Sequence, residues 1–346
     1  MKILALEKEI IEKKFNAATR SKQIHEAVLL VENTQGDFSV NCGYGGKDIH
    51  SPFFTASVTK LFVTSCILVL REQNKLSLDN KISDYLDKNM IDGLHVYKGK
   101  DYSHSLTISD LLFQTSGLPD ALFEGGYYKR LMREDIELSF EEALEKTKTL
   151  RPRFAPNTGK KAYYSDMNFR LLCKIIEKAN DMSLAQAYHD CVFAPLGMSN
   201  TYLPVKSDDF IPNIYCKNEI LYRPKYLTDS YNYDLISTTV DVMRFLKAFF
   251  GGVLFPKEVF EKLSVYRPLQ ITMGPQYYGG GYMQIPLGSI LTLFMGKGEL
   301  IGHSGSTGSF AFYYPRKDLY FVGDVNQMAN PALSIQLLLK LAFSLK

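Results

Sequence analysis

The sequence lacks long hydrophobic runs and extended runs of one charge. No window of its 346 residues approaches the roughly 18 apolar residues that a membrane-spanning helix requires. The formal net charge is only +3, and no stretch of Lys and Arg exceeds a few residues. Nucleic-acid binding usually requires a basic patch, so this composition does not indicate such a partner. We expect neither a membrane span nor nucleic-acid binding.

Cysteine and histidine are few and scattered. The six histidines and five cysteines form neither a CxxC nor an HExxH spacing, so we expect no structural or catalytic zinc site. An odd number of cysteines at irregular spacing is typical of reduced thiols in a cytoplasmic protein. The segment "MKILALEKEIIEKKFNAATR" has an apolar stretch of about five residues before its charges, unlike a secretory signal peptide. These features predict a cytoplasmic location.

Hydrophobic periodicity predicts strands at both ends of the chain and helices between them. Residues 26–45 have the pattern of a β-hairpin, and the segment after Pro268 alternates short apolar runs with turns, from 288 to 326, as antiparallel strands do. Helical patterns cover 57–74, 107–114 with Thr107 as N-cap, 139–149, 166–180, 183–198 stopped at Pro195 and Gly197, and 330–346.

This order predicts an α+β fold, with an antiparallel sheet flanked by N- and C-terminal helices and an inserted helical lobe. We expect residues 1–75 and 250–346 to form the sheet domain and residues 76–249 the mainly helical lobe, with the active site between them. The hydrophobic content of 46% and the length suffice for a large core.

One candidate site is the pair Ser57 and Lys60 in "FFTASVTKLF", within an otherwise apolar segment. Residues three apart on a helix share a face, so the Lys60 amine can reach the Ser57 hydroxyl. A serine at a helix start, beside an amine, has the arrangement of an activated nucleophile. The alternative is an N-cap serine beside a solvated lysine, because this spacing is common by chance.

Two later segments offer partners for that serine. Tyr164, in "AYYSDMNFRLL", precedes a helix, where its phenol is able to relay a proton if a nearby ammonium lowers its pKa. His303 begins "HSGSTG" on a predicted strand, and the Ser306 N–H is then available to pair with the Ser57 N–H as an oxyanion hole worth about 3 kcal/mol per donor. A packing tyrosine and a structural histidine are the alternatives.

The order of these segments resembles the three-motif pattern of serine penicillin-recognising enzymes: Ser57-Val58-Thr59-Lys60, then Tyr164-Ser165-Asp166, then His303-Ser304-Gly305. That group includes class C β-lactamases, D-Ala-D-Ala carboxypeptidases and β-lactamase-like esterases. Four more segments are similar to the family over about residues 25 to 330: "LTISDLLFQTSGLPD", "FAPNTGKKAYYSDMNFRLLCKIIE", "APLGMSNTYL" and "DLISTTVDVMRFLKAFF".

The resemblance implies a serine acyl hydrolase without a cofactor. Ser57 would be the nucleophile and Lys60 would orient it and share its proton. Tyr164 would act as general base and acid, and His303 would line the opposite wall, donating to Tyr164 or to the substrate. The N–H groups of Ser57 and Ser306 would hold the oxyanion, with Asp166, Ser304 and Gly305 at the substrate.

Two departures from the family pattern bear on the substrate. Asp166 stands where the family usually has Asn, and an ionised Asp only accepts hydrogen bonds, so it suits an amide carbonyl poorly. His303 replaces a lysine that helps to bind a substrate carboxylate, and its charge is conditional at neutral pH. Neither Lys297 nor Arg316, both near in sequence, is an evident replacement.

These departures favour a peptidase or esterase for small acyl or D-aminoacyl substrates over a class C-like β-lactamase. A non-catalytic penicillin or peptidoglycan-fragment sensor is the alternative of another class. The aromatic segments 275–283 and 215–233 are candidate walls of an apolar acyl pocket, although core packing is the alternative for most of their tyrosines. The sequence indicates no oligomeric state.

Overall fold

The structure, a computed structural model, describes residues 2–156, 158, 160–206, 208, 211–229, 233–274, 276–288 and 296–345. Its centre is an eight-stranded antiparallel sheet with the strand order β2-β1-β14-β13-β12-β11-β10-β9. The strands are β1 (Ala27–Asn33), β2 (Ser39–Tyr44), β9 (Arg267–Pro268), β10 (Tyr277–Tyr278), β11 (Met283–Pro286), β12 (Glu299–Ser304), β13 (Ser309–Tyr314) and β14 (Leu319–Asp324).

The sheet is made from both ends of the chain. Strand β1 pairs with β2 as the predicted hairpin, and on its other side with β14, with Val28 opposite Asp324. All six residues of β14 are buried, which a strand covered on both faces requires. The predicted α+β fold is confirmed. Residues 289–295 of the predicted strand region lie outside the described residues.

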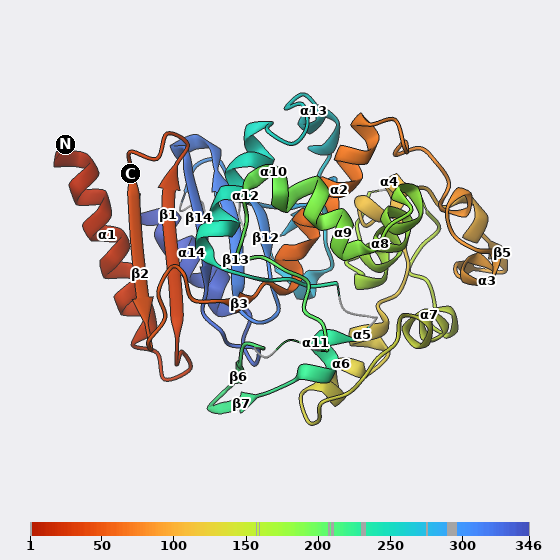
Figure 1. Ribbon diagram of the computed structural model, residues 1–346, viewed down its shortest axis with the longest axis horizontal. Helices are drawn as coiled ribbons and strands as arrows, with labels where there is room; N and C mark the ends of the chain where they lie inside the picture. The colour runs from red at the N-terminus through yellow and green to blue at the C-terminus, as the bar shows by residue number, and fades with distance from the viewer. Residues whose placement is uncertain are drawn as a thin grey trace.

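Helices cover both faces of this sheet (Figure 1). The first helix, α1 (Lys2–Thr19), contacts the last, α14 (Ala332–Ser344), as expected for flanking terminal helices. Helix α12 (Thr239–Gly251) packs against β1, β13 and β14, although the predicted boundary at residue 250 assigns it to the helical lobe. The domain boundaries themselves stay a prediction.

The predicted helices of the middle region are present as α2 (Thr59–Glu72), α4 (Ile108–Leu112), α7 (Phe140–Thr149) and α8 (Asp166–Asn180). Thr107 is the N-cap of α4, since its hydroxyl accepts the N–H of Asp110 at 3.1 Å. The shorter elements of this region are α3 (Lys88–Ile91), α5 (Ala121–Glu124), α6 (Tyr127–Leu131), α11 (Pro224–Thr228), α13 (Val259–Leu263), β3 (Phe53–Phe54), β4 (Val96–Tyr97), β5 (Lys100–Asp101), β6 (Ile214–Cys216), β7 (Glu219–Leu221) and β8 (Ile236–Ser237).

The predicted helix over 183–198 is a chain of three helical pieces, α9 (Leu184–Tyr188), a π turn at 189–193 and α10 (Ala194–Leu196). It ends at Gly197, whose φ of 61° is left-handed, as predicted. The predicted stop at Pro195 is wrong. Pro195 lies in the first turn of α10, where a missing N–H is tolerated.

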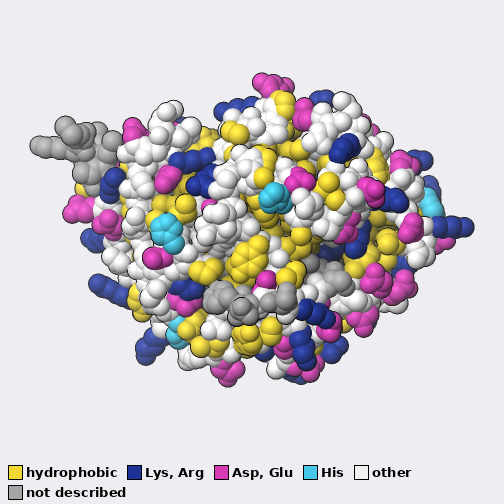
Figure 2. Space-filling view, in the orientation of Figure 1, with side chains coloured by type: hydrophobic (Ala, Val, Ile, Leu, Met, Phe, Trp, Pro, Cys, Tyr) yellow, Lys and Arg dark blue, Asp and Glu magenta, His cyan; other side chains and the backbone are white. Residues whose placement is uncertain are grey.

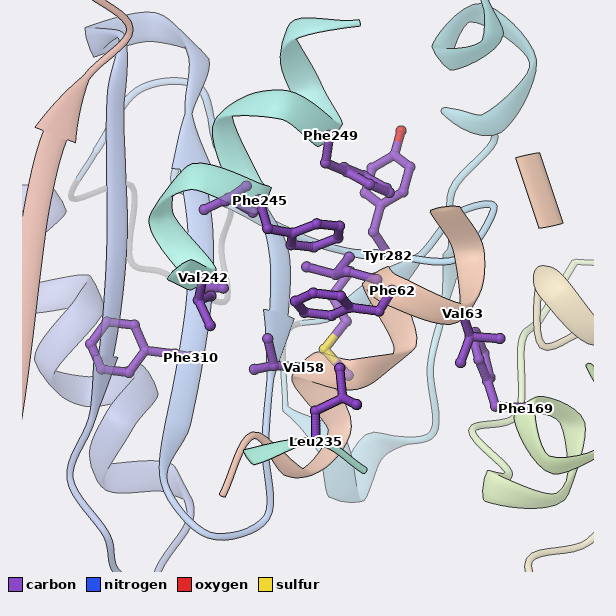
Figure 3. Packing of buried hydrophobic residues seen from close by; sticks show 14 of the residues in the cluster. Val58, Phe62, Val63, Phe169, Leu235, Val242, Phe245, Phe249, Tyr282 and Phe310 are labelled. Carbon is purple, nitrogen blue, oxygen red and sulfur yellow. The ribbon is translucent and has the colours of Figure 1, made fainter. Parts of the chain in front are cut away.

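Helix α2 is held between α12 and α8 by large apolar side chains. The rings of Phe62 and Phe245 stack with centroids 3.7 Å apart, and Val63 of α2 and Phe169 of α8 point toward one another (Figure 3). Every residue of α2 from Thr59 to Leu68 is buried. Because this packing is dense, the N-terminal end of α2 has a fixed position relative to both the sheet and the helical part.

The outer surface carries charges of both signs. On the face in Figure 2, Lys and Arg side chains are interspersed with Asp and Glu, and apolar side chains are exposed between them near its middle. Among the described residues, no helix is long and apolar enough to cross a membrane. Within the same residues, no three His, Cys, Asp or Glu side chains are grouped as a metal site would require.

Candidate active site

Ser57 lies in a 3-10 turn, Ala56–Val58, that leads from β3 into α2. Ala56 has a φ of 45°, a conformation that is costly for a residue with a side chain. The turn is held by Thr55, whose hydroxyl donates to Leu235 O at 2.7 Å and whose carbonyl accepts from Ser309 Oγ at 2.7 Å. Ser57 is partly exposed, and its side chain caps neither helix. The N-cap alternative for Ser57 is therefore wrong.

Lys60 is completely buried. Its Nζ donates to Ser57 Oγ at 3.2 Å and to Asp166 Oδ1 at 2.6 Å. Burial lowers the pKa of Lys60, but Asp166, Tyr164 and Asp234 together raise it by more, with Asp166 contributing most, so the pKa lies above its ordinary value. The solvated-lysine alternative is wrong, and the amine next to Ser57 is an ammonium.

Asp166, the first residue of α8, is the centre of a buried ion cluster. Its Oδ1 accepts from Lys60 and from Tyr233 Oη at 3.0 Å, and its Oδ2 accepts from Arg170 Nε at 3.0 Å and Nη2 at 2.9 Å. Burial raises the pKa of Asp166, but the Lys60 and Arg170 charges and the hydrogen bonds to the carboxylate outweigh burial. The pKa therefore lies well below its usual range. Asp166 is therefore an ionised acceptor, as the sequence predicts.

Two further buried carboxyl groups adjoin this cluster. Asp120 accepts the N–H groups of Asp166 at 2.9 Å and Phe123 at 3.1 Å. Burial, together with repulsion from Asp166, raises the pKa of Asp120 and of Asp234. Sequence reasoning misses Asp120, Asp234, Tyr233 and Arg170. Only Arg170 has a local signal, the i, i+4 spacing from Asp166.

Tyr164 faces Ser57 across this cluster. Ser57 and Lys60 both act on its hydroxyl to lower its pKa, and Lys60 Nζ lies 5.1 Å from its ring centroid. Lys60 lowers the pKa of Tyr164, as expected of a nearby ammonium, but the net shift is upward. Burial raises the pKa of Tyr164 by more than Lys60 lowers it, because a phenolate loses most of its hydration there.

Two glutamines hold the main chain around Tyr164. The N–H of Tyr164 donates to Gln270 Oε1 at 3.0 Å, and Gln270 lines the same cavity as Ser57. The N–H of Tyr163 donates to Gln114 O, and that of Ser165 to Gln114 Oε1, both at 2.9 Å. Three successive N–H groups are thus fixed by side chains or loops from elsewhere in the chain, which limits the movement of the phenol.

His303 lies on β12 and is completely buried. Its Nδ1 is 2.9 Å from Ser304 O and its Nε2 is 3.4 Å from Tyr278 Oη, so Nδ1 carries the proton and donates to Ser304. The centroids of its ring and the Tyr164 ring are 6.0 Å apart. No hydrogen bond from His303 to Tyr164 is present among the described contacts. Its predicted role at the substrate stays a prediction.

We expect His303 to make the fold sensitive to acid. Burial, then the Lys60 charge, lowers the pKa of His303 to about 3, while the unfolded value is about 6.5. The neutral ring therefore contributes stability above pH 6.5, which is lost at about 1.4 kcal/mol per pH unit as the pH falls toward 3. When the unfolding free energy is measured with urea between pH 7 and 4, its decrease per pH unit should be smaller in His303→Gln than in the wild type. An equal slope in both proteins would contradict the assignment of a neutral, buried imidazole.

The segment after His303 brings a glycine turn against the nucleophile. Ser304, Gly305 and Ser306 line the same cavity as Ser57. A Cβ on Gly305 would lie only 2.8 Å from the Thr55 carbonyl oxygen and 2.9 Å from the Ala56 Cβ. Glycine is needed here because the turn approaches the Ser57 backbone so closely.

The cavity in front of Ser57 has a volume of about 710 Å³. The two predicted aromatic walls contribute little to it. Segment 275–283 provides Gln276 and Met283 but neither Tyr277 nor Tyr278, and segment 215–233 provides Arg223 and Tyr226. Residue 275 of the first wall and residues 230–232 of the second lie outside the described residues. Most of the apolar wall comes instead from side chains with no such pattern, namely Phe54, Leu122, Phe123, Tyr128, Leu131 and Ile214.

The sequence model of the family described as Beta-lactamase matches residues 30–341. The chain belongs to the beta-lactamase family. Membership makes it a serine hydrolase of the beta-lactamase and penicillin-binding-protein type. The resemblance read from the three motifs is confirmed.

Other beta-lactamase-family proteins are similar over much of the chain. A penicillin-binding protein of Bacillus subtilis is 26% identical over 90% of this chain and 70% of its own length. A putative D-alanyl-D-alanine carboxypeptidase of Escherichia coli is 26% identical over 69% of this chain and 54% of its own. The matched region thus spans between 54% and 70% of the length of these two relatives. The crystal structure of a D-stereospecific amidohydrolase from Streptomyces has the same fold, with a TM-score of 0.76 and 20% identity over 95% of this chain and 97% of that one.

Proposed function

We propose that this protein forms an acyl-enzyme on Ser57 and hydrolyses esters and amides of small acyl and D-aminoacyl groups, as a carboxypeptidase or esterase does. The observation that carries this proposal is the triangle of Ser57, Lys60 and Tyr164. The Ser57 hydroxyl accepts from an ammonium that stays charged, and the buried Tyr164 phenol lies beside that ammonium.

In the proposed reaction, Tyr164 takes the Ser57 proton and Lys60 stays charged. The reacting form has a Tyr164 phenolate beside the Lys60 ammonium. Ser57 Oγ bonds to the substrate carbonyl carbon as its proton moves to the phenolate, and the carbonyl oxygen becomes an oxyanion facing the Ser57 and Ser306 N–H groups. The bond to the leaving group then breaks as Tyr164 donates that proton to it. Water repeats the sequence on the acyl group and frees Ser57.

The substrate preference follows from the Asp166 carboxylate, which already accepts hydrogen bonds within the protein. Asp166 has no proton to donate, and its oxygens already accept from three side chains. A substrate amide carbonyl placed there meets an anion instead of a donor, which disfavours β-lactams with an acylamino side chain. The similarity to a D-stereospecific amidohydrolase and to a putative carboxypeptidase supports D-aminoacyl substrates instead.

Covalent labelling tests this function directly. We expect a fluorophosphonate probe to modify the protein at Ser57, located by peptide mapping, and expect no label on Ser57→Ala. A fluorescent penicillin distinguishes the alternatives. A stable Ser57 adduct without turnover of p-nitrophenyl acetate or a D-alanyl anilide would indicate a sensor. Rapid nitrocefin turnover would indicate a β-lactamase. A folded protein that neither reagent labels at Ser57 would overturn the proposal.

A further inference from the structure

An apolar wall leads away from Ser57 within the cavity. A hydrophobic cluster separate from the main core contains Phe54, Leu131, Ile214, Tyr226 and Met328, and all five line the cavity. Phe54 lies three residues before Ser57 in the chain, so the wall begins beside the nucleophile. A cavity of about 710 Å³ accommodates a ligand far larger than an alanyl group.

Arg223 lies on the same cavity wall as this cluster. Its Nε donates to Leu131 O at 2.8 Å, its Nη1 to Tyr222 O at 3.1 Å and its Nη2 to Met132 O at 3.5 Å. These three contacts fix the guanidinium, yet all are to uncharged carbonyl oxygens. A guanidinium has five N–H donors, so two of them have no partner among the described contacts. Among the described ion pairs, none joins Arg223 to a carboxylate.

The other charged side chains on the cavity wall have charged or polar partners in the chain. Arg170 is paired with Asp166, and Glu124 contacts Arg153 and accepts from Tyr163 Oη at 2.7 Å. Arg223 therefore differs from Arg170, the other arginine of the lining, because its charge is held in place without a counter-charge from the described chain. An anionic group of a ligand would supply the missing counter-charge to Arg223.

The apolar wall lies on the acyl side of the proposed reaction. In the proposed reaction Tyr164 protonates the leaving group, and we place that group on the Gln270 side of the cavity, because Gln270 lines the cavity beside Tyr164. Tyr226 lines the cavity within the same hydrophobic cluster as Phe54, which lies three residues before Ser57. The acyl portion therefore extends along Tyr226 and Leu131 toward Arg223.

We propose that Arg223 binds a carboxylate at the far end of the substrate's acyl chain. The inference rests on the proposed function and names its substrate class: acyl groups with an apolar middle and a terminal carboxylate, as in the half-esters of dicarboxylic acids. The apolar cluster takes the methylene chain, and Arg223 takes the carboxylate through its two remaining donors.

The test compares p-nitrophenyl half-esters of succinic, adipic and suberic acids with the same esters bearing a terminal carboxamide. For at least one chain length we expect kcat/KM for the carboxylate to exceed that for the carboxamide by about tenfold or more. The ratio should fall to about 1 in Arg223→Gln, take an intermediate value in Arg223→Lys, and decrease with added salt. Arg130→Gln, an exposed arginine paired with Glu134 outside the cavity, is the matched control and should keep the ratio.

Calorimetry separates this proposal from the proposed function. Suberic acid monoamide is titrated into Ser57→Ala with and without Arg223→Gln, and we expect at least about tenfold weaker binding in the double variant. If this difference is found but the wild type cleaves no ester, the proposed reaction fails and the carboxylate subsite stands. A wild-type ratio near 1 at every length, or a ratio unchanged in Arg223→Gln, overturns the subsite even when all the esters are cleaved.

Discussion

Tyr164→Phe is expected to lower kcat/KM for p-nitrophenyl acetate by about 10³-fold, within the range for loss of a general acid–base group. The Lys60 ammonium has no vacant site for the Ser57 proton, because its pKa is raised by Asp166. The phenol of Tyr164 is then the group that accepts it. Because burial raises the pKa of Tyr164, the phenolate fraction is small at neutral pH and grows as the pH rises. The wild-type kcat/KM should therefore increase with pH above neutrality, and this increase should vanish in Tyr164→Phe.

Tyr233→Phe is the matched control for this prediction. Tyr233 is also a buried phenol in contact with Asp166, and Lys60 Nζ lies 5.3 Å from its ring centroid. Its hydroxyl donates to the carboxylate and not to Ser57, so its loss should change kcat/KM by less than about tenfold. The measurement is kcat/KM from pH 6 to 10 for the wild type, Tyr164→Phe and Tyr233→Phe. An alkaline increase that persists in Tyr164→Phe would show that another group takes the serine proton.

The sequence predicts the fold well, and at the site it predicts Ser57, Lys60 and Tyr164, for identifiable reasons. The hairpin at 26–45 and the strands of 299–324 have short-range alternation, and the nucleophile pair is three residues apart on one helix. Tyr164 and His303 are found through motif order, which records long-range contacts that composition alone does not show. Local patterns thus succeed where the partners are close in sequence.

The electrostatic environment of the site is what the sequence does not show. Tyr233 reaches Asp166 across 67 residues, and Asp120 reaches it across 46, with no local periodicity to join them. The sign of the Tyr164 pKa shift depends on burial outweighing one ammonium, and only the packed structure sets that balance. Arg223 likewise has no motif, since its position on the cavity wall depends on where α6 and α11 meet.

Asp166→Asn is expected to destabilise the fold by about 3–5 kcal/mol at pH 7, because it leaves Lys60 and Arg170 buried without their shared carboxylate. The pKa of Asp166 is lower in the folded chain than the unfolded value of about 4. Its ion pairs therefore stabilise the fold above pH 4, and that contribution is lost as the pH falls further. The difference in unfolding free energy between wild type and variant should be full at pH 7 and shrink toward pH 2.

The same substitution should shift the reaction toward amides. The side-chain amide that it introduces has N–H donors for a substrate carbonyl, and Lys60, without the partner that raises its pKa, becomes able to lose its proton and act as a base. We expect the ratio of kcat/KM for nitrocefin to that for p-nitrophenyl acetate to rise by about tenfold or more. Asp241→Asn, at a buried carboxylate that accepts from Asn200 and Thr201 and does not line the cavity, is the control that loses stability but keeps the ratio. If Asp166→Asn folds and leaves this ratio unchanged, the carboxylate does not select against β-lactams, and the preference for esters must come from the cavity walls.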